Sequence, residues 1–203
     1  MFRSVSPDHY FSPKPDVPSK PGEVQLSLPD FKASLAVDRG VFSSGGVDGG
    51  TMELLRAVPP PPDGGNLLDL GCGYGPIACT LAHRSPRATV WAVDINERAL
   101  ALTRQNAHSL GLSGVRAVTP DQLSPALVFD GIWSNPPIRI GKQPLQDLLS
   151  GWFQRLAAGA SAWLVVQRHL GSDSLASWLT STGYAVERTG SRKGYRILRV
   201  TRS

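Results

Sequence analysis

The stretch LLDLGCGYGP, residues 67–76, decides how the chain around it folds. Its apolar run leads into three glycines at alternate positions, Gly71, Gly73 and Gly75. Glycine adopts positive φ without a steric penalty and lets a ligand lie against bare backbone. Pro76 suits the first turn of a helix, where no N–H is required. The stretch therefore predicts a strand, a tight glycine turn and a helix, whose free N–H groups favour a negative group on a ligand.

The glycine pattern differs from that of the common dinucleotide-binding turn. That turn has the form G-x-G-x-x-G, and Pro76 stands here at its third glycine. Asp69 instead begins the spacing acid-x-G-x-G-x-G. A second apolar run, residues 88–93, ends in Asp94, and an acid at the end of the next strand accepts hydrogen bonds from ribose hydroxyls. Together the two features resemble the S-adenosylmethionine site of class I methyltransferases.

The composition fits a single globular domain. The chain of 203 residues is long enough for a sizeable core, and its contents of 41% apolar and 18% charged residues are ordinary. We expect one methyltransferase domain over residues 1–203, with an N-terminal extension, residues 1–62, and a cofactor-binding catalytic core, residues 63–203. The net charge of +5 favours an anionic partner such as nucleic acid, although a generally basic protein shows the same balance.

Cysteine usage and hydropathy indicate the cellular compartment of the protein. Cys72 and Cys79 have no histidine cluster nearby, so we expect neither a metal site nor a disulfide framework. A reducing cytoplasm is the natural setting for such a chain. No apolar run is long enough to span a membrane, and the segment Met1–Asp8 lacks the apolar core of a signal peptide. We therefore expect a cytoplasmic protein without a membrane span.

The order of patterns along the chain predicts a hairpin, a helix and then alternating strands and helices. Residues 24–28 and 31–37 alternate apolar and polar side chains, which predicts the hairpin. Thr51 is expected to cap a helix that runs to Val58. From Asn66 onward the alternation predicts an α/β fold with a parallel sheet flanked by helices. The expected strands are residues 67–70, 88–93, 115–118, 129–134 and 161–166, the expected helices are 76–84, 97–110, 145–156 and 174–182, and a closing hairpin is expected at 184–188 and 195–201.

A second cluster of polar groups follows the strand expected at residues 129–134. It reads Asn135-Pro136-Pro137-Ile138, and the two prolines make the backbone rigid and extended. The side-chain carbonyl of Asn135 and the backbone carbonyl of Pro136 are two acceptors that can hold both hydrogens of an NH2 group. Because ligands lie beyond the carboxyl ends of the strands in such sheets, this cluster and the glycine turn are expected to meet there.

The same residues, taken together, resemble one family of class I enzymes. Asp69–Gly75 followed by Asn135–Ile138 is similar to the methyltransferases that modify planar amine nitrogens. Further segments resemble the "methyltransferase small" family, which includes the guanine-N2 methyltransferases of small-subunit ribosomal RNA; these segments are His9–Ser12, Gly40–Ser43, Asp48–Thr51, Asn135–Lys142 and Lys193–Arg196. The resemblance implies a Rossmann-like sheet of seven mostly parallel strands with an antiparallel last strand and helices on both faces.

The resemblance also implies the cofactor, the acceptor and the role of each site residue. The donor would be S-adenosylmethionine and the acceptor a guanine amine in ribosomal RNA or the small ribosomal subunit. The cofactor would be held by the loop of Gly71, Cys72, Gly73 and Gly75, by Asp69 at its amino group, by Asp94 at the ribose, by Ile95 and Asp121 at the adenine, and by Phe42 and Thr51 closing the pocket. Asn135, Pro136, Pro137 and Ile138 would form the catalytic segment, with Asn135 also beside the cofactor.

The chain departs from the family pattern in two respects. The best-known guanine-N2 enzymes carry a second, cofactor-less domain that this sequence does not contain, so RNA recognition would fall to a shorter N-terminal piece or to a homodimer. Ile138 stands where many relatives have an aromatic residue, so base stacking would come from Phe11, Phe42 or Tyr195. Phosphate contacts are expected from Arg139, Lys142, Arg192, Lys193 and Arg196, each of which is equally well a solvated surface charge.

Two other functions are compatible with these motifs. An Asn-Pro-Pro segment also serves adenine-N6 and protein glutamine-N5 methyltransferases, because amides and aryl amines pose the same positioning problem. Tyrosine at position 138 would favour those acceptors, whereas Ile138 and the positive charge favour RNA. A non-catalytic RNA-binding domain of the same fold is the third possibility, and the presence of Asp69, Asp94 and Asn135 argues against it.

Overall fold

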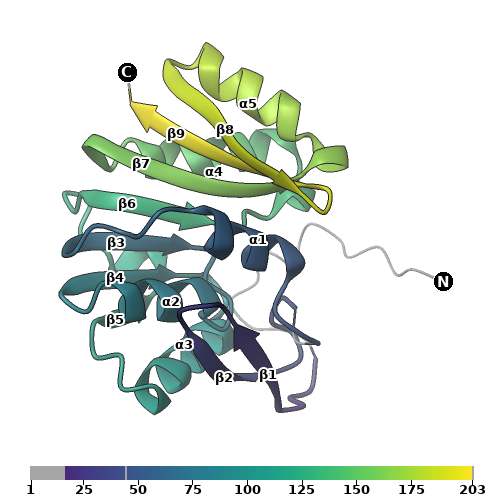
Figure 1. Ribbon diagram of the computed structural model, residues 1–203, viewed down its shortest axis with the longest axis vertical. Helices are drawn as coiled ribbons and strands as arrows, with labels where there is room; N and C mark the ends of the chain where they lie inside the picture. Colours follow the sequence, from purple (N-terminus) through teal and green to yellow (C-terminus); the bar gives the residue numbers. More distant parts are fainter. Residues whose placement is uncertain (1–16, 44, 203) are drawn as a thin grey trace.

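The main sheet of the protein has seven strands. The computed structural model describes residues 17–43 and 45–202, and its strand order is β5-β4-β3-β6-β7-β9-β8 (Figure 1). The strands are β3 (Gly65–Leu70), β4 (Ala88–Val93), β5 (Val115–Val118), β6 (Phe129–Ser134), β7 (Leu156–Gln167), β8 (Tyr184–Arg192) and β9 (Tyr195–Arg202). β9 pairs antiparallel with β7 and β8, and the other pairings are parallel. This arrangement confirms the expected mixed sheet with an antiparallel last strand.

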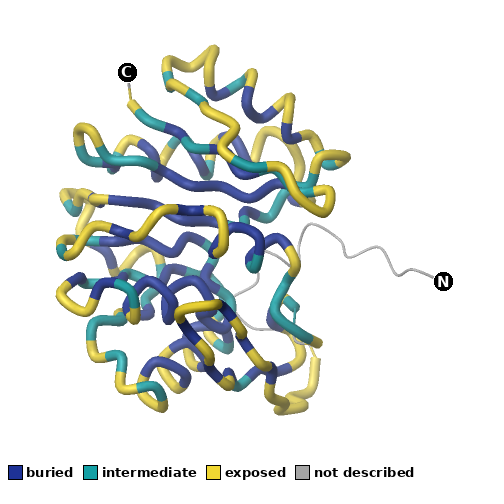
Figure 2. The backbone as a smooth tube through the Cα atoms, viewed as in Figure 1, coloured by how far each residue is buried: buried dark blue, intermediate teal, exposed yellow. Residues whose placement is uncertain are grey.

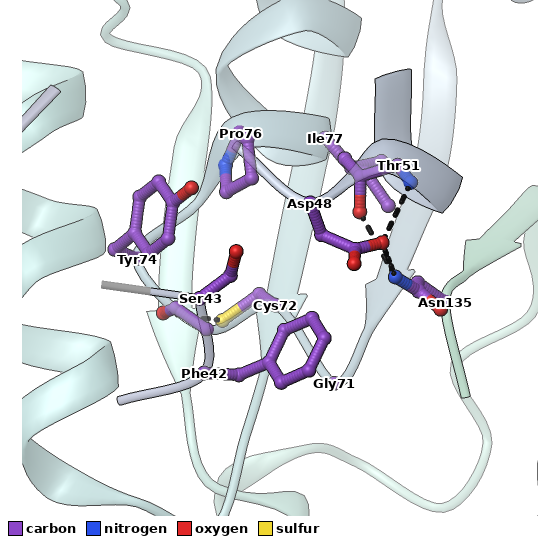
Figure 3. A pocket seen from close by; sticks show the side chains of 11 residues that line it. Phe42, Ser43, Asp48, Thr51, Gly71, Cys72, Tyr74, Pro76, Ile77 and Asn135 are labelled. Carbon is purple, nitrogen blue, oxygen red and sulfur yellow. Dashed lines mark hydrogen bonds between the residues drawn. The ribbon is translucent and has the colours of Figure 1, made fainter. Parts of the chain in front are cut away.

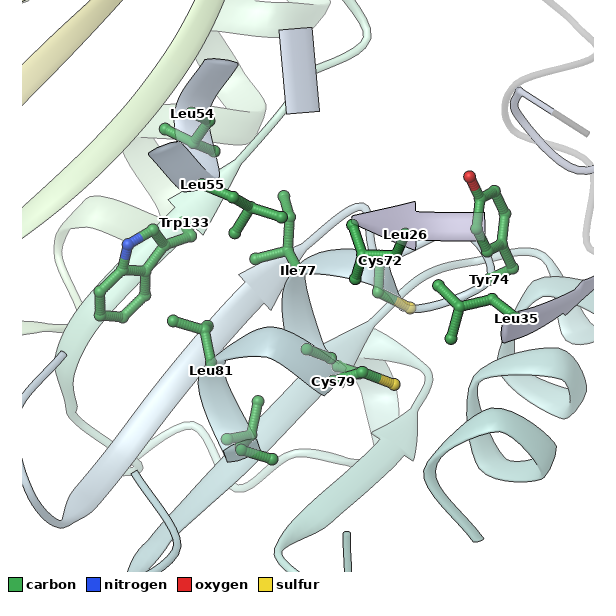
Figure 4. Packing of buried hydrophobic residues seen from close by; sticks show 14 of the residues in the cluster. Leu26, Leu35, Leu54, Leu55, Cys72, Tyr74, Ile77, Cys79, Leu81 and Trp133 are labelled. Carbon is green, nitrogen blue, oxygen red and sulfur yellow. The ribbon is translucent and has the colours of Figure 1, made fainter. Parts of the chain in front are cut away.

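Helices cover both faces of this sheet. They are α1 (Gly49–Ala57), α2 (Pro76–Arg84), α3 (Glu97–Ser109), α4 (Lys142–Phe153) and α5 (Ser172–Ser181). Successive strand residues point to opposite faces, so Leu67 joins the apolar cluster of α1–α3 and Leu68 joins that of α4 and α5. Figure 2 shows the central strands buried between these layers, and Figure 4 shows Leu55 of α1 and Ile77 of α2 in the first cluster with Trp133 of β6.

A two-stranded hairpin, β1 (Gly22–Ser27) and β2 (Lys32–Val37), packs beside α3 (Figure 1). Asn106 of α3 is buried and joins the two: its Oδ1 accepts from the N–H of Ala36 at 2.7 Å, and its Nδ2 donates to the carbonyl of Ala36 at 3.0 Å. Nδ2 also donates to the carbonyl of Tyr74 at 2.8 Å. One side chain therefore connects the hairpin, α3 and the glycine loop. The segment His9–Ser12, with Phe11, lies outside the described residues.

The expected cap of α1 was wrong. Asp48, not Thr51, is the N-cap: its side chain accepts from the N–H groups of Gly50 and Thr51. The helix begins two residues earlier than Thr51 because Asp48 reaches these otherwise unpaired donors, leaving the Thr51 hydroxyl available for another contact.

Several further element boundaries differ from the expected ones; for example, β8 continues to Arg192 rather than ending at residue 188. α4 begins at Lys142 rather than at residue 145, because Pro144 falls in the first turn, where its missing N–H removes no hydrogen bond. β7 begins at Leu156 rather than at residue 161, because Leu156 already pairs with Phe129 before a register shift in β6. In the described part of the chain, no helix has the length and apolarity needed to cross a membrane.

Replacing Asn106 tests the connection between the hairpin and the core. We expect Asn106→Ala to lower the free energy of unfolding by about 3 kcal/mol, because buried backbone groups of Ala36 and Tyr74 lose their partners. Urea unfolding measures this loss. Gln105→Ala, an exposed neighbour on the same helix, should change it by less than about 0.5 kcal/mol. Equal effects of the two substitutions would contradict the connecting role.

Candidate functional site

The glycine loop after β3 is fixed by the end of β4. The N–H groups of Gly71 and Cys72 both donate to the carbonyl of Val93, at 2.8 and 3.0 Å. The N–H of Gly73 donates to Oδ2 of Asp94 at 2.9 Å. The φ angles of Gly71 and Gly73 are +77° and +56°, in the region that favours glycine. The loop is therefore held as a turn of bare backbone at the carboxyl ends of two parallel strands.

Asp69 lies behind this loop and is fully buried. Its Oδ2 accepts from the N–H of Ala78 at 2.9 Å, which fixes the start of α2 to the end of β3. Among the described residues, its Oδ1 has no hydrogen-bond partner. Burial, assisted by the charge of Asp94 and opposed by the N–H of Ala78, raises the pKa of Asp69 to about 8. The carboxyl group thus favours its neutral form, and its Oδ1 is a buried polar atom with which a ligand can pair.

Asp94 directs its carboxylate into the turn between β4 and α3. Its Oδ1 accepts from the N–H of Asn96 at 3.0 Å, while Oδ2 accepts from Gly73 as described. Burial raises its pKa, and the surrounding backbone N–H groups oppose that rise. Ile95 is half-buried beside it, whereas Asp121 is exposed in a short helical turn, Pro120–Gln122. The roles of these three residues at a ribose and an adenine stay predictions.

A pocket lies in front of the glycine loop, between the core and the N-terminal extension (Figure 3). It brings together five of the expected cofactor residues of the loop and extension with Asn135 of the catalytic segment. Its lining consists of Phe42, Ser43, Asp48, Thr51, Gly71, Cys72, Gly73, Tyr74, Pro76, Ile77 and Asn135. Sequence reasoning did not assign Asp48 or Tyr74 to the site, although Asp48 lies beside the expected helix start and in the segment Asp48–Thr51 that resembles the family. The side chain of Phe42 is 65% exposed, which leaves an aromatic ring free at this pocket.

Asn135 is held by two residues of the N-terminal extension. Its Nδ2 donates to Oδ1 of Asp48 at 2.7 Å and to Oγ1 of Thr51 at 3.1 Å. Figure 3 shows the amide nitrogen turned toward these two acceptors and the amide oxygen turned away from them. In the part of the chain that the structure describes, the side-chain carbonyl of Asn135 accepts no hydrogen bond, so it is left as the acceptor that a site for an NH2 group requires.

The two prolines after Asn135 fix the backbone of the catalytic segment. The carbonyl of Pro136 accepts from the N–H of Ile138 at 2.8 Å, and Pro137 has φ −77° and ψ +74°, the geometry of an inverse γ-turn. This turn holds the direction of the Pro136 carbonyl, which keeps a second lone pair for another donor. Ile138 is half-buried and packs against the cluster of α4 and α5.

The expected phosphate-binding residues differ in whether they pair with a carboxylate. Within the described residues, Arg139 and Lys142 are exposed and form no ion pair. Arg196 is only 16% exposed and pairs with Asp173. The remaining two cations, Arg192 and Lys193, are exposed but lie near the buried carboxylate of Glu53, at 3.9 and 3.4 Å.

Tyr195 supports the start of α1. A Cβ atom at Gly50 would lie 2.8 Å from the ring of Tyr195, so only glycine fits there. The hydroxyl of Tyr195 accepts from Nε2 of Gln167 at 3.2 Å. With one ring face against α1, Tyr195 is less free to stack on a base than Phe42.

The sheet order, the glycine loop and the acid at the end of β4 define a class I S-adenosylmethionine-dependent methyltransferase. The sequence model described as "Methyltransferase small domain" matches residues 32–199, which is most of the chain. The protein belongs to the methyltransferase small family, and S-adenosylmethionine is the cofactor of its class.

Known relatives include proteins of similar length and longer ones. An uncharacterized protein of Bacillus subtilis, YbxB, is 34% identical over 195 residues, covering 95% of this chain and 97% of its own. "Ribosomal RNA small subunit methyltransferase C" of Pseudomonas entomophila is 31% identical and covers 98% of this chain. This chain spans 59% of the length of that protein. The protein of the same name from Shewanella piezotolerans is 33% identical, and this chain spans 44% of its length.

A solved structure shares the fold over nearly the whole chain. The 16S rRNA guanine-N2 methyltransferase of T. thermophilus, in complex with AdoMet and guanosine, superposes with a TM-score of 0.76. It is 23% identical, and the match covers 93% of this chain and 52% of that one. The likeness confirms the fold.

The residues present fit S-adenosylmethionine. The glycine loop offers bare backbone on the pocket side, and behind it Oδ1 of Asp69 is a buried polar atom that no described residue pairs with. Asp94 stands at the end of β4, where a ribose is bound in such sheets. Gly71 and Gly73 would hold the methionine part of the cofactor. Asp69 would bind its amino group, and Asp94 would bind its ribose.

The raised pKa of Asp69 predicts a pH dependence of stability. The folded carboxyl has a pKa of about 8 and the unfolded one about 3.8, so the folded state binds the extra proton between these values. The contribution of Asp69 to the free energy of unfolding is thus fully present below its unfolded-state pKa. It is lost as pH rises through its folded-state pKa. Asp69→Asn keeps a neutral acceptor for the N–H of Ala78 and does not titrate. As pH rises from about 5 to about 8, the free energy of unfolding of the wild type should therefore fall relative to that of the variant. Urea unfolding across this range measures the difference, and parallel curves would show that Asp69 is ionised throughout.

Proposed function

We propose that this protein transfers the methyl group of S-adenosylmethionine to the exocyclic N2 of a guanine in small-subunit ribosomal RNA. The observation that carries the proposal is the orientation of Asn135 beside the pocket. Its nitrogen donates to Asp48 and Thr51, so its oxygen is the atom that can accept a hydrogen bond from the group to be methylated. An exocyclic amine is such a donor, and it presents two hydrogens.

The chain's own residues position the acceptor rather than activate it. The carbonyl of Asn135 and the second lone pair of the Pro136 carbonyl accept the two N–H groups of the amine, which directs the nitrogen lone pair toward the methyl donor. When bound, S-adenosylmethionine supplies a methyl group already activated by the sulfonium charge, so no strong base is needed before attack. The proton leaves the amine during or after transfer. Cys72, Ile77 and Phe42 line the pocket and limit the water around the reacting atoms.

Three features favour RNA as the acceptor. The net charge is +5, and the exposed Arg139 and Lys142 come soon after Ile138 in the chain. Phe42 offers an exposed ring at the pocket, on which a base can stack in place of the aromatic residue missing at Ile138. Relatives at 31% and 33% identity carry names of small-subunit ribosomal RNA methyltransferases.

The direct test uses tritiated S-adenosylmethionine and small ribosomal subunits from a strain that lacks this protein. After incubation the RNA is digested to nucleosides, and label in N2-methylguanosine is the expected result. Label in N6-methyladenosine or in protein would move the acceptor and overturn the guanine assignment. No label anywhere would overturn the proposed function as a whole.

A matched pair of variants separates catalysis from cofactor binding. Asn135→Ala should raise the barrier to transfer by about 2.7 kcal/mol, about a hundredfold in turnover, because one positioned acceptor is lost. Calorimetry should show little change in its affinity for the cofactor. Asp94→Ala should instead lose that affinity, because the acceptor at the end of β4 is gone. Equal losses of affinity in both would make Asn135 a structural residue.

The cations after the catalytic segment predict a change in salt dependence. Removing Arg139 and Lys142 together should reduce the slope of log binding constant against log salt by about 1.5, since each phosphate contact contributes about 0.7 to 0.9. Filter binding of ribosomal RNA at several salt concentrations measures the slope. The control removes two exposed cations elsewhere, Lys32 at the start of β2 and Arg202 at the end of β9, and leaves the slope unchanged. Equal slopes for both double variants would remove Arg139 and Lys142 from the RNA interface.

A further inference from the structure

We infer that Asp48 is a positioning residue which, with Thr51, sets the orientation of the Asn135 amide and so determines which of its atoms meets the acceptor amine. The inference rests on the proposed function and adds to it a residue outside the catalytic segment. Asp48 belongs to the N-terminal extension, and it lies 87 residues from Asn135 along the chain. The catalytic segment is thus incomplete without the extension.

A single oxygen of Asp48 accepts three hydrogen bonds. Its Oδ1 receives the N–H of Gly50 at 2.9 Å, the N–H of Thr51 at 3.1 Å and Nδ2 of Asn135 at 2.7 Å. The first two are helix-capping bonds and hold the carboxylate against the start of α1. The capping bonds therefore fix the position of the Asp48 oxygen, and that oxygen in turn fixes the amide nitrogen of Asn135.

The chemistry of these groups permits only one orientation of the amide. An ionised carboxylate accepts hydrogen bonds and donates none, so the amide nitrogen must face Asp48. A rotation of half a turn about the last side-chain bond of Asn135 would place its oxygen against the oxygen of Asp48. It would also present an NH2 group to the acceptor amine, where donor meets donor and no hydrogen bond forms. The Thr51 hydroxyl, buried and 3.1 Å from Nδ2, adds a second acceptor on the same side.

The start of α1 is itself held from the other side. A Cβ atom at Gly50 would lie 2.8 Å from the ring of Tyr195, and one at Gly49 would lie 3.3 Å from its hydroxyl oxygen. Gln167 of β7 donates to the hydroxyl of Tyr195, which fixes the ring to the sheet. Asp48 thus stands on a helix start that cannot shift away from Asn135 without losing this packing.

Three variants separate the positioning role from capping and from charge. Asp48→Ser keeps a good N-cap, but its hydroxyl is one atom too short to reach Asn135. Asp48→Asn must turn its oxygen toward the N–H groups of Gly50 and Thr51, so it caps the helix and still accepts from Asn135 without a charge. Thr51→Val keeps the shape of the side chain and removes only the hydroxyl acceptor.

Turnover on small ribosomal subunits at saturating cofactor is the first readout. We expect Asp48→Ser to lower kcat about tenfold or more, Thr51→Val about threefold to tenfold, and Asp48→Asn to stay within about threefold of the wild type. KM for the subunit, the cofactor Kd from calorimetry and the Tm should stay close to those of the wild type. Full activity of Asp48→Ser overturns the inference. Loss in Asp48→Asn equal to that in Asp48→Ser also overturns it, because the charge rather than the orientation would then matter.

A second readout is independent of methylation. The side-chain amide signals of Asn135 in a ¹H–¹⁵N spectrum are identified by their absence in Asn135→Ala. In the wild type and in Asp48→Asn they should be protected from solvent exchange, and in Asp48→Ser they should exchange rapidly. Unchanged exchange in Asp48→Ser overturns the inference even if the acceptor proves to be something other than guanine. Failure of the wild type to methylate subunits, with the exchange pattern intact, would instead count against the proposed function alone.

Discussion

The carbonyl oxygen of Val93 accepts the N–H groups of both Gly71 and Cys72, and the rest of the site depends on this contact. It turns the chain sharply as it leaves β3, so that α2 starts directly behind the loop. Asp69 can then reach the N–H of Ala78, and the loop backbone faces the pocket. Any side chain that disturbed the positive φ of Gly71 would displace all of these groups together.

Much of the fold could be predicted from the sequence because its patterns are local. Apolar runs that end in Asp69 and Asp94 mark the two strand ends, and a proline after the glycines marks the helix start. The order of strands and helices and the antiparallel last strand follow from the alternation and the family resemblance, and the structure confirms them. The start of α4 was misplaced: the helix begins at Lys142, since its first turn tolerates Pro144.

The rest could not be predicted because it arises from contacts between distant residues. The sequence shows Asp48 near a helix start and Asn135 after a strand, but nothing local indicates that one carboxylate oxygen serves both. The same is true of Arg196, which reads as a free surface cation and instead pairs with Asp173. Polar side chains choose among many partners of similar energy, and only the packed backbone decides between them.

The packing of Tyr195 against Gly50 also bears on how the protein folds. Gly50 lies in the first turn of α1, and Tyr195 begins β9, far from it along the chain. The start of α1 therefore reaches its final packing only when β9 has joined the sheet, so the step that completes the sheet also completes the site.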